Sequence, residues 1–172
     1  MAHASAARAV AAAARAEALP PDIGRFRGFL ARGVPGAHAY VVLLGLDTFD
    51  ALHLMRALQN GLPYRTLERF QRNTGLPLDV LIDLVDIPRR TLARRKRDGR
   101  LGPDESDRLL RASRVFARAL ALFEGDREAA TEWLTSRQPA LGGAVPIALA
   151  RTDLGAREVE ALAGRLEHGV FP

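Results

Sequence analysis

The chain has 172 residues, a length that suits one domain or two small ones. Hydrophobic residues make up 48% of it, which is enough to fill a core, and aromatic residues make up only 6%. Alanine and leucine supply much of the hydrophobic fraction, and because both are strong helix formers the composition favours an all-α fold. Cysteine is absent, which excludes a disulfide framework, a thiol nucleophile and a thiolate metal site, and fits a reducing cytoplasm.

The formal net charge is +5, and nearly all of the positive charge is arginine, since Lys96 is the only lysine. Arginine binds phosphate and the guanine edge in a bidentate geometry that lysine cannot match. A GC-rich genome explains the overall bias equally well. The positions of the arginines are therefore better evidence for nucleic-acid binding than their number.

The N-terminal part is the least regular. Residues 1–21 form an Ala-rich leader in which Arg8 and Arg15 interrupt the apolar run that a secretory signal needs. We expect a frayed helical or disordered extension there, with a presequence of the mitochondrial type as the alternative. Residues 22–47 are broken up by glycine and proline, and their apolar stretch 39–46 is compatible with a short helix or a strand. No apolar run approaches the about 18 residues that a membrane span needs.

Clear start and stop signals appear from Thr48 onward. Thr48 can cap a helix that ends near Asn60, with Gly61 past its end. The apolar side of that helix is expected to hold Phe49, Leu52, Leu54, Met55 and Leu58. We expect helices over residues 48–60, 63–74, 78–85, 89–98 and 103–123, one that begins at Asp126, one turn at Pro146, and a last helix from Asp153 or Gly155 to about 168.

The second, third and fourth of these helices are short and joined by turns of two to four residues, which is the spacing of a helix-turn-helix. The fourth helix carries six cations in the nine residues 89–97. With Leu92 toward the core, a step of about 100° per residue places Arg90, Arg94 and Arg97 on the opposite side. Such a helix suits the major groove, where its first residues reach base edges and later cations hold phosphates. The candidate DNA-binding residues are Arg89, Arg90, Thr91, Arg94, Arg95, Lys96 and Arg97.

Two other interpretations of this basic helix stay open. A run of charge is usually a solvated face, and an acidic protein surface is another possible partner. Nothing in the chain points to catalysis, because the four histidines lack the spacing of metal ligands and there is no Walker-type pattern. We therefore expect neither an enzyme, nor a metal site, nor a cofactor.

Several stretches resemble one antitoxin family. Gly61-Leu62-Pro63, followed by Leu67-Glu68-Arg69, and the run from Ile87 to Arg95 resemble the Xre-like helix-turn-helix domain of Xre/MbcA/ParS antitoxins. Family members often place a capping serine before the recognition helix, where this chain has Pro88, and Pro77 similarly precedes the helix before it. Proline cannot cap through its side chain, but it pre-sets a suitable φ.

The C-terminal part resembles the toxin-binding domain of the same family. The resemblance runs through 101–109, 117–123, 129–134 and 140–146, and it is most specific in the block from Thr152 to Phe171. Ala144-Val145 stands where relatives commonly have Arg-Thr before the loop proline. The likeness covers about residues 45–171. It implies an all-α helical bundle with a leader and poorly defined segment over 1–47, an Xre-like helix-turn-helix domain over 48–101, and a toxin-binding and dimerisation domain over 102–172.

The resemblance implies the antitoxin of a type II toxin–antitoxin system in the bacterial cytoplasm, with no membrane partner. The other partner is usually a RES-domain toxin that consumes NAD, and the antitoxin neutralises it by direct binding. The helix-turn-helix represses the operon by binding operator DNA, and the protein is a homodimer formed through the toxin-binding domain. The residues expected to face the toxin are Arg157, Arg165, Glu167, His168, Gly169, Val170 and Phe171.

Alternatives remain at this C-terminal site and for the protein as a whole. Arg157 and Arg165 share one side of the last helix and could simply be solvated, and Val170 with Phe171 could pack back onto Trp133. A stand-alone helix-turn-helix regulator without a toxin is the main alternative function. A protein-interaction module that has lost its DNA contact is the other.

Overall fold

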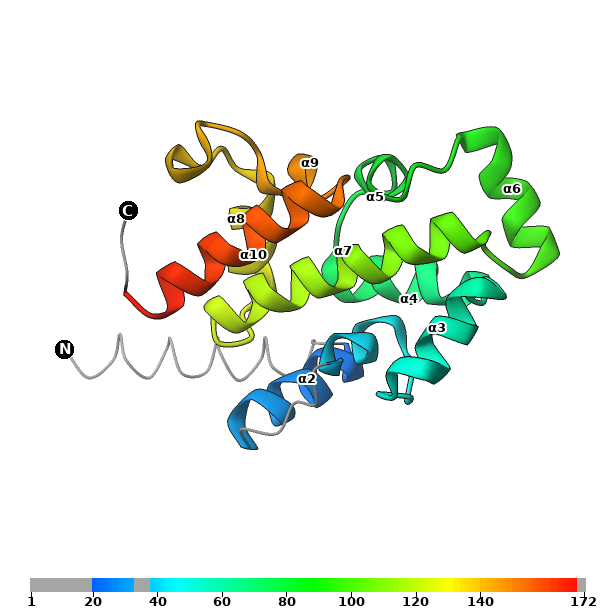
Figure 1. The fold of residues 1–172 in the computed structure, drawn as a ribbon, viewed down its shortest axis with the longest axis horizontal. Coiled ribbons are helices and arrows are strands. Elements are labelled where there is room, and N and C mark those ends of the chain that lie inside the picture. Colours follow the sequence, from blue (N-terminus) through cyan, green and yellow to red (C-terminus); the bar gives the residue numbers. More distant parts are fainter. Residues whose placement is uncertain (1–19, 33–37, 170–172) are drawn as a thin grey trace, which may run out of the picture.

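The computed structural model describes residues 20–32 and 38–169, and all of its regular elements are helices (Figure 1). The predicted all-α fold is confirmed. Residues 1–19 of the predicted leader lie outside the described residues, as do Val170 and Phe171. The elements are α2 (Pro21–Arg32), the 3-10 helix η1 (Ala39–Leu44), α3 (Ala51–Gln59), α4 (Tyr64–Thr74), α5 (Leu78–Val85), α6 (Arg89–Asp98), α7 (Pro103–Leu122), α8 (Arg127–Thr135), the 3-10 helix η2 (Pro139–Leu141), α9 (Pro146–Leu149) and α10 (Asp153–Glu167).

Helix α7 is the spine of the molecule and runs along its long axis, with α6 at one end and the C-terminal end of α10 at the other (Figure 1). Its 20 residues make it about 30 Å long. Glu105 caps its start by accepting a hydrogen bond from the Gly102 N–H at 2.6 Å, and Pro103 occupies the first helical position. Phe116, in the middle of α7, is fully buried and meets Phe70 of α4 edge to face, with ring centroids 6.0 Å apart. The core therefore forms around α7.

The segment that the sequence left irregular, residues 22–47, is part of this core. Its start is the helix α2, although Gly24 lies inside that helix, and its apolar stretch is the 3-10 helix η1 rather than a strand. Ile23 and Phe26 of α2 are buried, and every residue of η1 except Tyr40 is buried as well. Tertiary burial outweighs the loss that glycine imposes on an isolated helix.

A buried carboxylate holds α2 against α4. Asp22, only 2% exposed, accepts two hydrogen bonds from Arg69, at 2.6 and 2.8 Å. The Asn73 side-chain amide donates both to Asp22, at 2.8 Å, and to the Leu43 carbonyl of η1, at 2.7 Å. Burial by itself would raise the pKa of Asp22, but the hydrogen bonds from Arg69 and Asn73 and the charge of Arg69 hold that pKa below its usual value of 3.8. The cluster links α2, η1 and α4.

The predictions for α3 were wrong in two respects. Its N-cap is Asp50, which accepts from the His53 N–H at 2.9 Å, and not Thr48. Leu54 faces the core and is 3% exposed, but Leu52 and Met55, which were expected beside it, are 62% and 55% exposed. The apolar side of this helix is wide and extends from Ala57 round to Leu52, so periodicity could not tell which part of it faces inward.

The C-terminal helices begin where capping residues predict. Asp126 accepts from the Ala129 N–H at 3.0 Å and starts α8, and Thr152 accepts from the Gly155 N–H at 3.1 Å and starts α10 at Asp153. Gly155 lies so close to α9 that a Cβ there would be 2.1 Å from the Leu149 carbonyl oxygen. Helix α10 then packs along α7 (Figure 1).

None of the helices within residues 20–32 and 38–169 combines the length and apolar character that crossing a membrane requires.

Candidate DNA-binding helix and C-terminal surface

Helices α4, α5 and α6 follow one another through short turns, as the sequence predicted for this unit. Helices α4 and α5 pack against α7, and α5 and α6 match the expected bounds 78–85 and 89–98. The turn between them is made by Asp86, whose φ is 54°, and by the buried Ile87, whose N–H donates to the Ile82 carbonyl at 2.9 Å. Pro77 and Pro88 occupy the N-cap positions of α5 and α6 without a side-chain hydrogen bond. The unit is a helix-turn-helix with α6 in the recognition position.

Two neighbouring turns fix the position of α6. After α6, the Gly99 carbonyl accepts from the Tyr64 N–H and the Leu101 N–H donates to the Leu62 carbonyl, both at 2.9 Å. The Leu62 N–H in turn donates to the Ser106 hydroxyl at 2.8 Å, and Ser106 is fully buried. No local pattern in the sequence indicates this role of Ser106, because the two partners are 44 residues apart.

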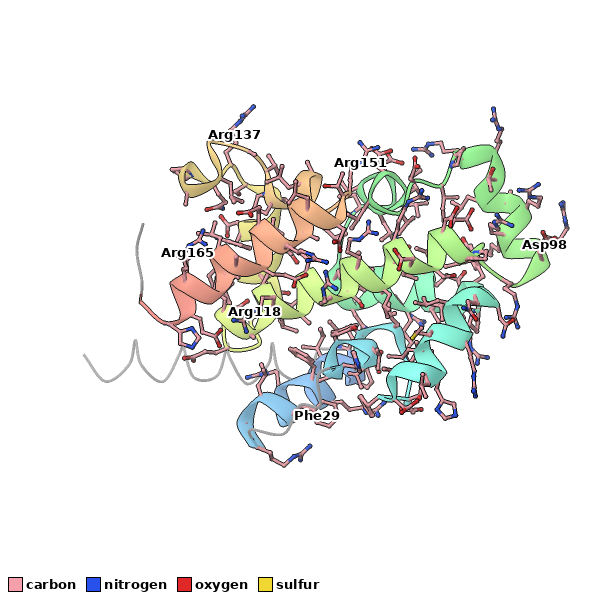
Figure 2. The ribbon with its side chains drawn as sticks, in the orientation of Figure 1. Phe29, Asp98, Arg118, Arg137, Arg151 and Arg165 are labelled. Atoms are coloured by element: carbon pink, nitrogen blue, oxygen red, sulfur yellow. The ribbon has the colours of Figure 1, made fainter. Side chains whose placement is uncertain are left out.

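Helix α6 lies at one end of the molecule and has no fully buried residue (Figure 1). Leu92 is half-buried and packs against the core, while Arg90, Arg94 and Arg97 are exposed, as the helical periodicity predicted. Asp98, at the end of α6, projects at the tip of the molecule (Figure 2). The basic side of α6 is therefore presented to solvent.

The cations of α6 differ in whether they form ion pairs within the chain. Arg89 forms an exposed ion pair with Asp79 at the start of α5, and Lys96 lies 3.4 Å from the carboxylate of Glu68. Arg95 is half-buried and pairs with the buried Glu105 of α7, with its Nε 2.8 Å from Oε2.

Arg90 and Arg94 are the two cations of α6 that have neither a side-chain hydrogen bond nor an ion pair within the described residues. They are free to contact another molecule, whereas the Arg95 side chain is held in an ion pair with Glu105 that connects α6 to α7. The Arg97 Nε lies 3.9 Å from the neighbouring Asp98 carboxylate, and Thr91 is half-buried.

The charges of α10 are mostly paired within the chain. Arg157 pairs with Asp153 one turn earlier at 2.9 Å, and Glu160 accepts from Arg114 of α7 at 2.6 Å. Glu167 lies 3.1 Å from Arg118, a residue of α7 (Figure 2).

Among the charged residues of α10, Glu158 and Arg165 have no ion pair within the described residues, and the apolar Leu154 is exposed. The Nε of Arg165 is buried and has no hydrogen-bond partner within the described residues. Leu154 is 73% exposed, more than any other large hydrophobic residue that the structure describes. His168 binds the Gly164 carbonyl through Nδ1 at 2.7 Å, and Gly169 ends the described chain with a φ of 68°. Arg157 and Arg165 lie on one helix as predicted, but only Arg157 is fully accessible.

No group of three or more His, Asp or Glu side chains in residues 20–32 and 38–169 could hold a metal ion.

The fold and the basic helix define a helix-turn-helix protein with a second, helical C-terminal part. Residues 53–114 match the family model of the antitoxin Xre-like helix-turn-helix domain, and residues 118–169 match that of the antitoxin Xre/MbcA/ParS C-terminal toxin-binding domain. The chain belongs to the Xre antitoxin family, as its motifs indicated.

Curated relatives share most of the chain. It is 36% identical over 129 residues to the antitoxin Xre of Yersinia enterocolitica, an alignment that covers 74% of this chain and 87% of the relative. It is 31% identical over 128 residues to the antitoxin Xre of Photorhabdus laumondii, which covers 74% of this chain and 86% of the relative. A shorter match, 37% identical over 84 residues, covers 48% of this chain and 52% of the antitoxin Xre of Pseudomonas putida.

Proposed function

We propose that the protein is the antitoxin of a type II toxin–antitoxin pair. Its C-terminal helices bind and neutralise a RES-type toxin that consumes NAD, and its helix-turn-helix represses the operon by binding operator DNA. One observation supports this proposal most strongly: two candidate surfaces are separated along α7. The unpaired arginines of α6 lie at one end, and residues 118–169, which match the toxin-binding domain model, form the other part of the molecule. Two ligands can therefore be held at once without competing for the same surface.

The DNA half of the proposal rests on Arg90 and Arg94. Both are exposed: Arg90 lies in the first turn of the proposed recognition helix, where side chains reach base edges, and Arg94 follows one turn later on the same side. Arg97 and Lys96 follow at the other end of α6, where they can contact phosphates. Arg89 can join them by leaving its exposed pair with Asp79, since pairs of that kind are weak.

The toxin half rests on α10 and the residues that follow it. Arg157 is exposed, and Arg165 is partly exposed and has no ion pair within the described residues, so the guanidinium group of each can meet a carboxylate or phosphate of the toxin complex. Leu154 adds an apolar contact on the same helix. Glu167, His168 and Gly169 follow at the end of the described chain, and the prediction that Val170 and Phe171 also face the toxin lies outside the described residues.

Co-expression with the neighbouring gene tests the proposal. We expect the tagged protein to co-purify with that gene product and to protect cells from it, and cells that express the neighbour alone to lose NAD. A neighbour that is harmless alone and does not co-purify would favour a stand-alone regulator. The complex should also shift DNA of its own promoter, with an affinity that falls steeply as salt rises. If the complex protects cells but never shifts promoter DNA, the protein would be a toxin-binding module that has lost its DNA contact.

A further inference from the structure

The second half of α6 is held to the molecule with little apolar burial. Within the described segment 88–100 no residue is buried, although Ile87 before it and Leu101 after it are each 3% exposed. Leu92, in the first half of α6, is half-buried and packs against the core. Apolar packing therefore fixes the two ends of this segment and one turn of α6, and polar contacts must set the direction of its last turns.

Two ion pairs attach these last turns to the rest of the molecule. Arg95 follows Leu92 by three residues and Lys96 by four, so at about 100° per residue their side chains flank Leu92 from opposite sides. Arg95 pairs with Glu105 of α7, and Lys96 pairs with Glu68 of α4. The second half of α6 is thus connected to two different helices.

Only the Arg95–Glu105 pair is shielded from water. Its side chains are 26% and 10% exposed, and Arg95 Nε lies 3.0 and 2.8 Å from the two oxygens of the carboxylate. The Lys96–Glu68 pair is wider, at 3.4 Å, and its side chains are 68% and 45% exposed. Water and salt screen an exposed pair, whereas separating a buried pair leaves a buried charge without a partner. The Arg95–Glu105 pair therefore restrains α6 more strongly.

The start of α7 holds this pair in one geometry. Glu105 Oε2 also accepts a hydrogen bond from the Gly102 N–H at 2.6 Å, which fixes the carboxylate relative to α7. A Cβ atom at residue 102 would lie 2.9 Å from Arg95 Nη2, so glycine leaves room for the guanidinium group. Because the φ of Gly102 is −72°, a value that any residue adopts, the close approach of Arg95 is what favours glycine here.

We propose that Arg95 and Glu105 are positioning residues for operator recognition. Their pair sets the angle at which α6 presents Arg90 and Arg94, and Arg95 itself does not contact DNA. The inference rests on the proposed operator binding. Base readout needs each side chain at a defined place over a base edge, whereas attraction to phosphates depends mainly on charge. The pair should therefore determine the preference for the operator and contribute little to the binding of DNA in general.

Glu105→Gln tests this role without removing a cation from α6. Glutamine keeps an oxygen that can accept from the Gly102 N–H, but it has no charge to hold Arg95. Fluorescence anisotropy compares a duplex from the chain's own promoter with a scrambled duplex of equal length. The ratio of the two affinities should fall about tenfold, in line with the loss of one good base contact.

The matched control is Glu68→Gln, which removes the same charge from the exposed partner of Lys96. It should change the affinities for the two duplexes alike and leave their ratio near the wild-type value. If Arg95 contacted DNA directly, Glu105→Gln would release it and tighten both complexes without changing the ratio. An unchanged ratio in Glu105→Gln would therefore overturn the proposal.

Salt dependence separates a positioning arginine from one that contacts phosphate. Each phosphate contact adds about 0.9 to the slope of log affinity against log salt on duplex DNA. On the scrambled duplex Arg95→Gln should keep the wild-type slope, whereas Arg97→Gln, at an exposed position of the same helix, should lower it by about 0.9. An equal decrease of the slope in Arg95→Gln would show that Arg95 leaves Glu105 to contact DNA, against the proposal.

The double variant R95Q/E105Q tests whether the two residues act as one unit. It should lose no more promoter preference than either single variant, because each single change already breaks the pair. Losses that add would indicate two independent roles and would contradict the proposal. Circular dichroism should show the same helix content for all of these variants.

Amide hydrogen exchange on the free protein provides a readout that needs no DNA. Residues 93–98 of α6 should exchange faster in Glu105→Gln than in the wild type, while α10 keeps its protection. Unchanged protection of α6 would overturn the proposal. A wild type that binds both duplexes equally would instead refute the proposed operator binding, and exchange in α6 would still decide whether the pair holds this helix.

Discussion

Helix α6 lies at one end of α7, whereas α10 packs along α7 toward its other end, and the two helices carry their charges in different ways. On α6, Arg90 and Arg94 have no partner in the described residues, and the basic side faces water. On α10, Arg157 and Glu160 are paired within the chain, and the most exposed large side chain is the apolar Leu154. From this difference we expect DNA contact at α6 to rely on charge and toxin contact at α10 to rely on packing, so that salt weakens the first far more than the second.

The largest expected effect comes from reversing the unpaired charges of α6. The R90E/R94E variant should bind operator DNA at least about 100-fold more weakly than the wild type, because two potential base or phosphate contacts become repulsive. Fluorescence anisotropy at one fixed salt concentration measures this loss, and toxin neutralisation should be unchanged.

The control for that variant is R137E/R151E, which makes the same change in net charge at exposed positions of the C-terminal half. If both double variants lost operator affinity equally, the overall positive charge of the protein would bind DNA, and α6 would have no specific role in it.

The second effect concerns α10. Leu154→Glu should weaken toxin binding roughly 30-fold, in line with the loss of about 2 kcal/mol that defines a strong interface contact, and should leave operator binding unchanged. Calorimetric titration of the toxin into each variant measures it. Leu78→Glu is the matched control, since it introduces the same charge at an exposed leucine of the other half. Full toxin affinity in Leu154→Glu would place the docking surface elsewhere on the chain.

The third effect is on folding. Asp22→Asn should lower the free energy of unfolding by about 1–3 kcal/mol, because it weakens the buried hydrogen bonds to Arg69 and Asn73. Chemical denaturation measures the change. Asp47→Asn, which removes an exposed pair with Arg25, should cost less than about 1 kcal/mol. Similar losses from the two variants would show that the buried cluster contributes little.

The same carboxylate predicts how stability depends on pH. The pKa of Asp22 is lower in the folded chain than its usual value, so its contribution is fully present above about pH 4, where the unfolded chain also ionises. As the pH falls further, the unfolded chain binds the proton first, and the contribution disappears as the pH passes through the lowered pKa. Asp22→Asn should therefore lose less stability on acidification than the wild type, and an identical acid transition would contradict the shift.

The smallest effect is a gain. Asp79→Asn should tighten operator binding about two- to fivefold, because it frees Arg89 and removes a negative charge beside the expected position of a phosphate. The control is Asp83→Asn on the same helix, an exposed aspartate for which the described residues show no ion pair. A loss of affinity in Asp79→Asn would mean that Asp79 positions Arg89 for its contact with DNA.

Much of this architecture follows from local signals. Helices α5 and α6 were predicted to the residue, and Asp126 caps α8 as expected, because short-range capping and turn residues determine these boundaries. The exposed side of α6 also followed from periodicity. The family was identifiable from motifs, since the matching blocks keep their order along the chain.

What sequence reasoning missed depends on contacts between distant residues. Helix α2 is held by the pairing of Asp22 with Arg69, 47 residues away, which no local pattern reveals. Arg95 was grouped with the DNA-binding cations, but its side chain pairs with Glu105 across a turn. The sequence-based list for α6 remains a prediction, with Arg90 and Arg94 as its most accessible members.

The uninterrupted course of α7 has a consequence for how such proteins can be recombined. The two family matches, residues 53–114 and 118–169, meet within this one helix, so no flexible linker separates the parts. Inserting or deleting one residue at that junction would turn one half against the other by about 100° and shift it by about 1.5 Å. Chimaeras that exchange C-terminal halves between relatives must therefore preserve the helical phase of α7, even where every contacting side chain is kept.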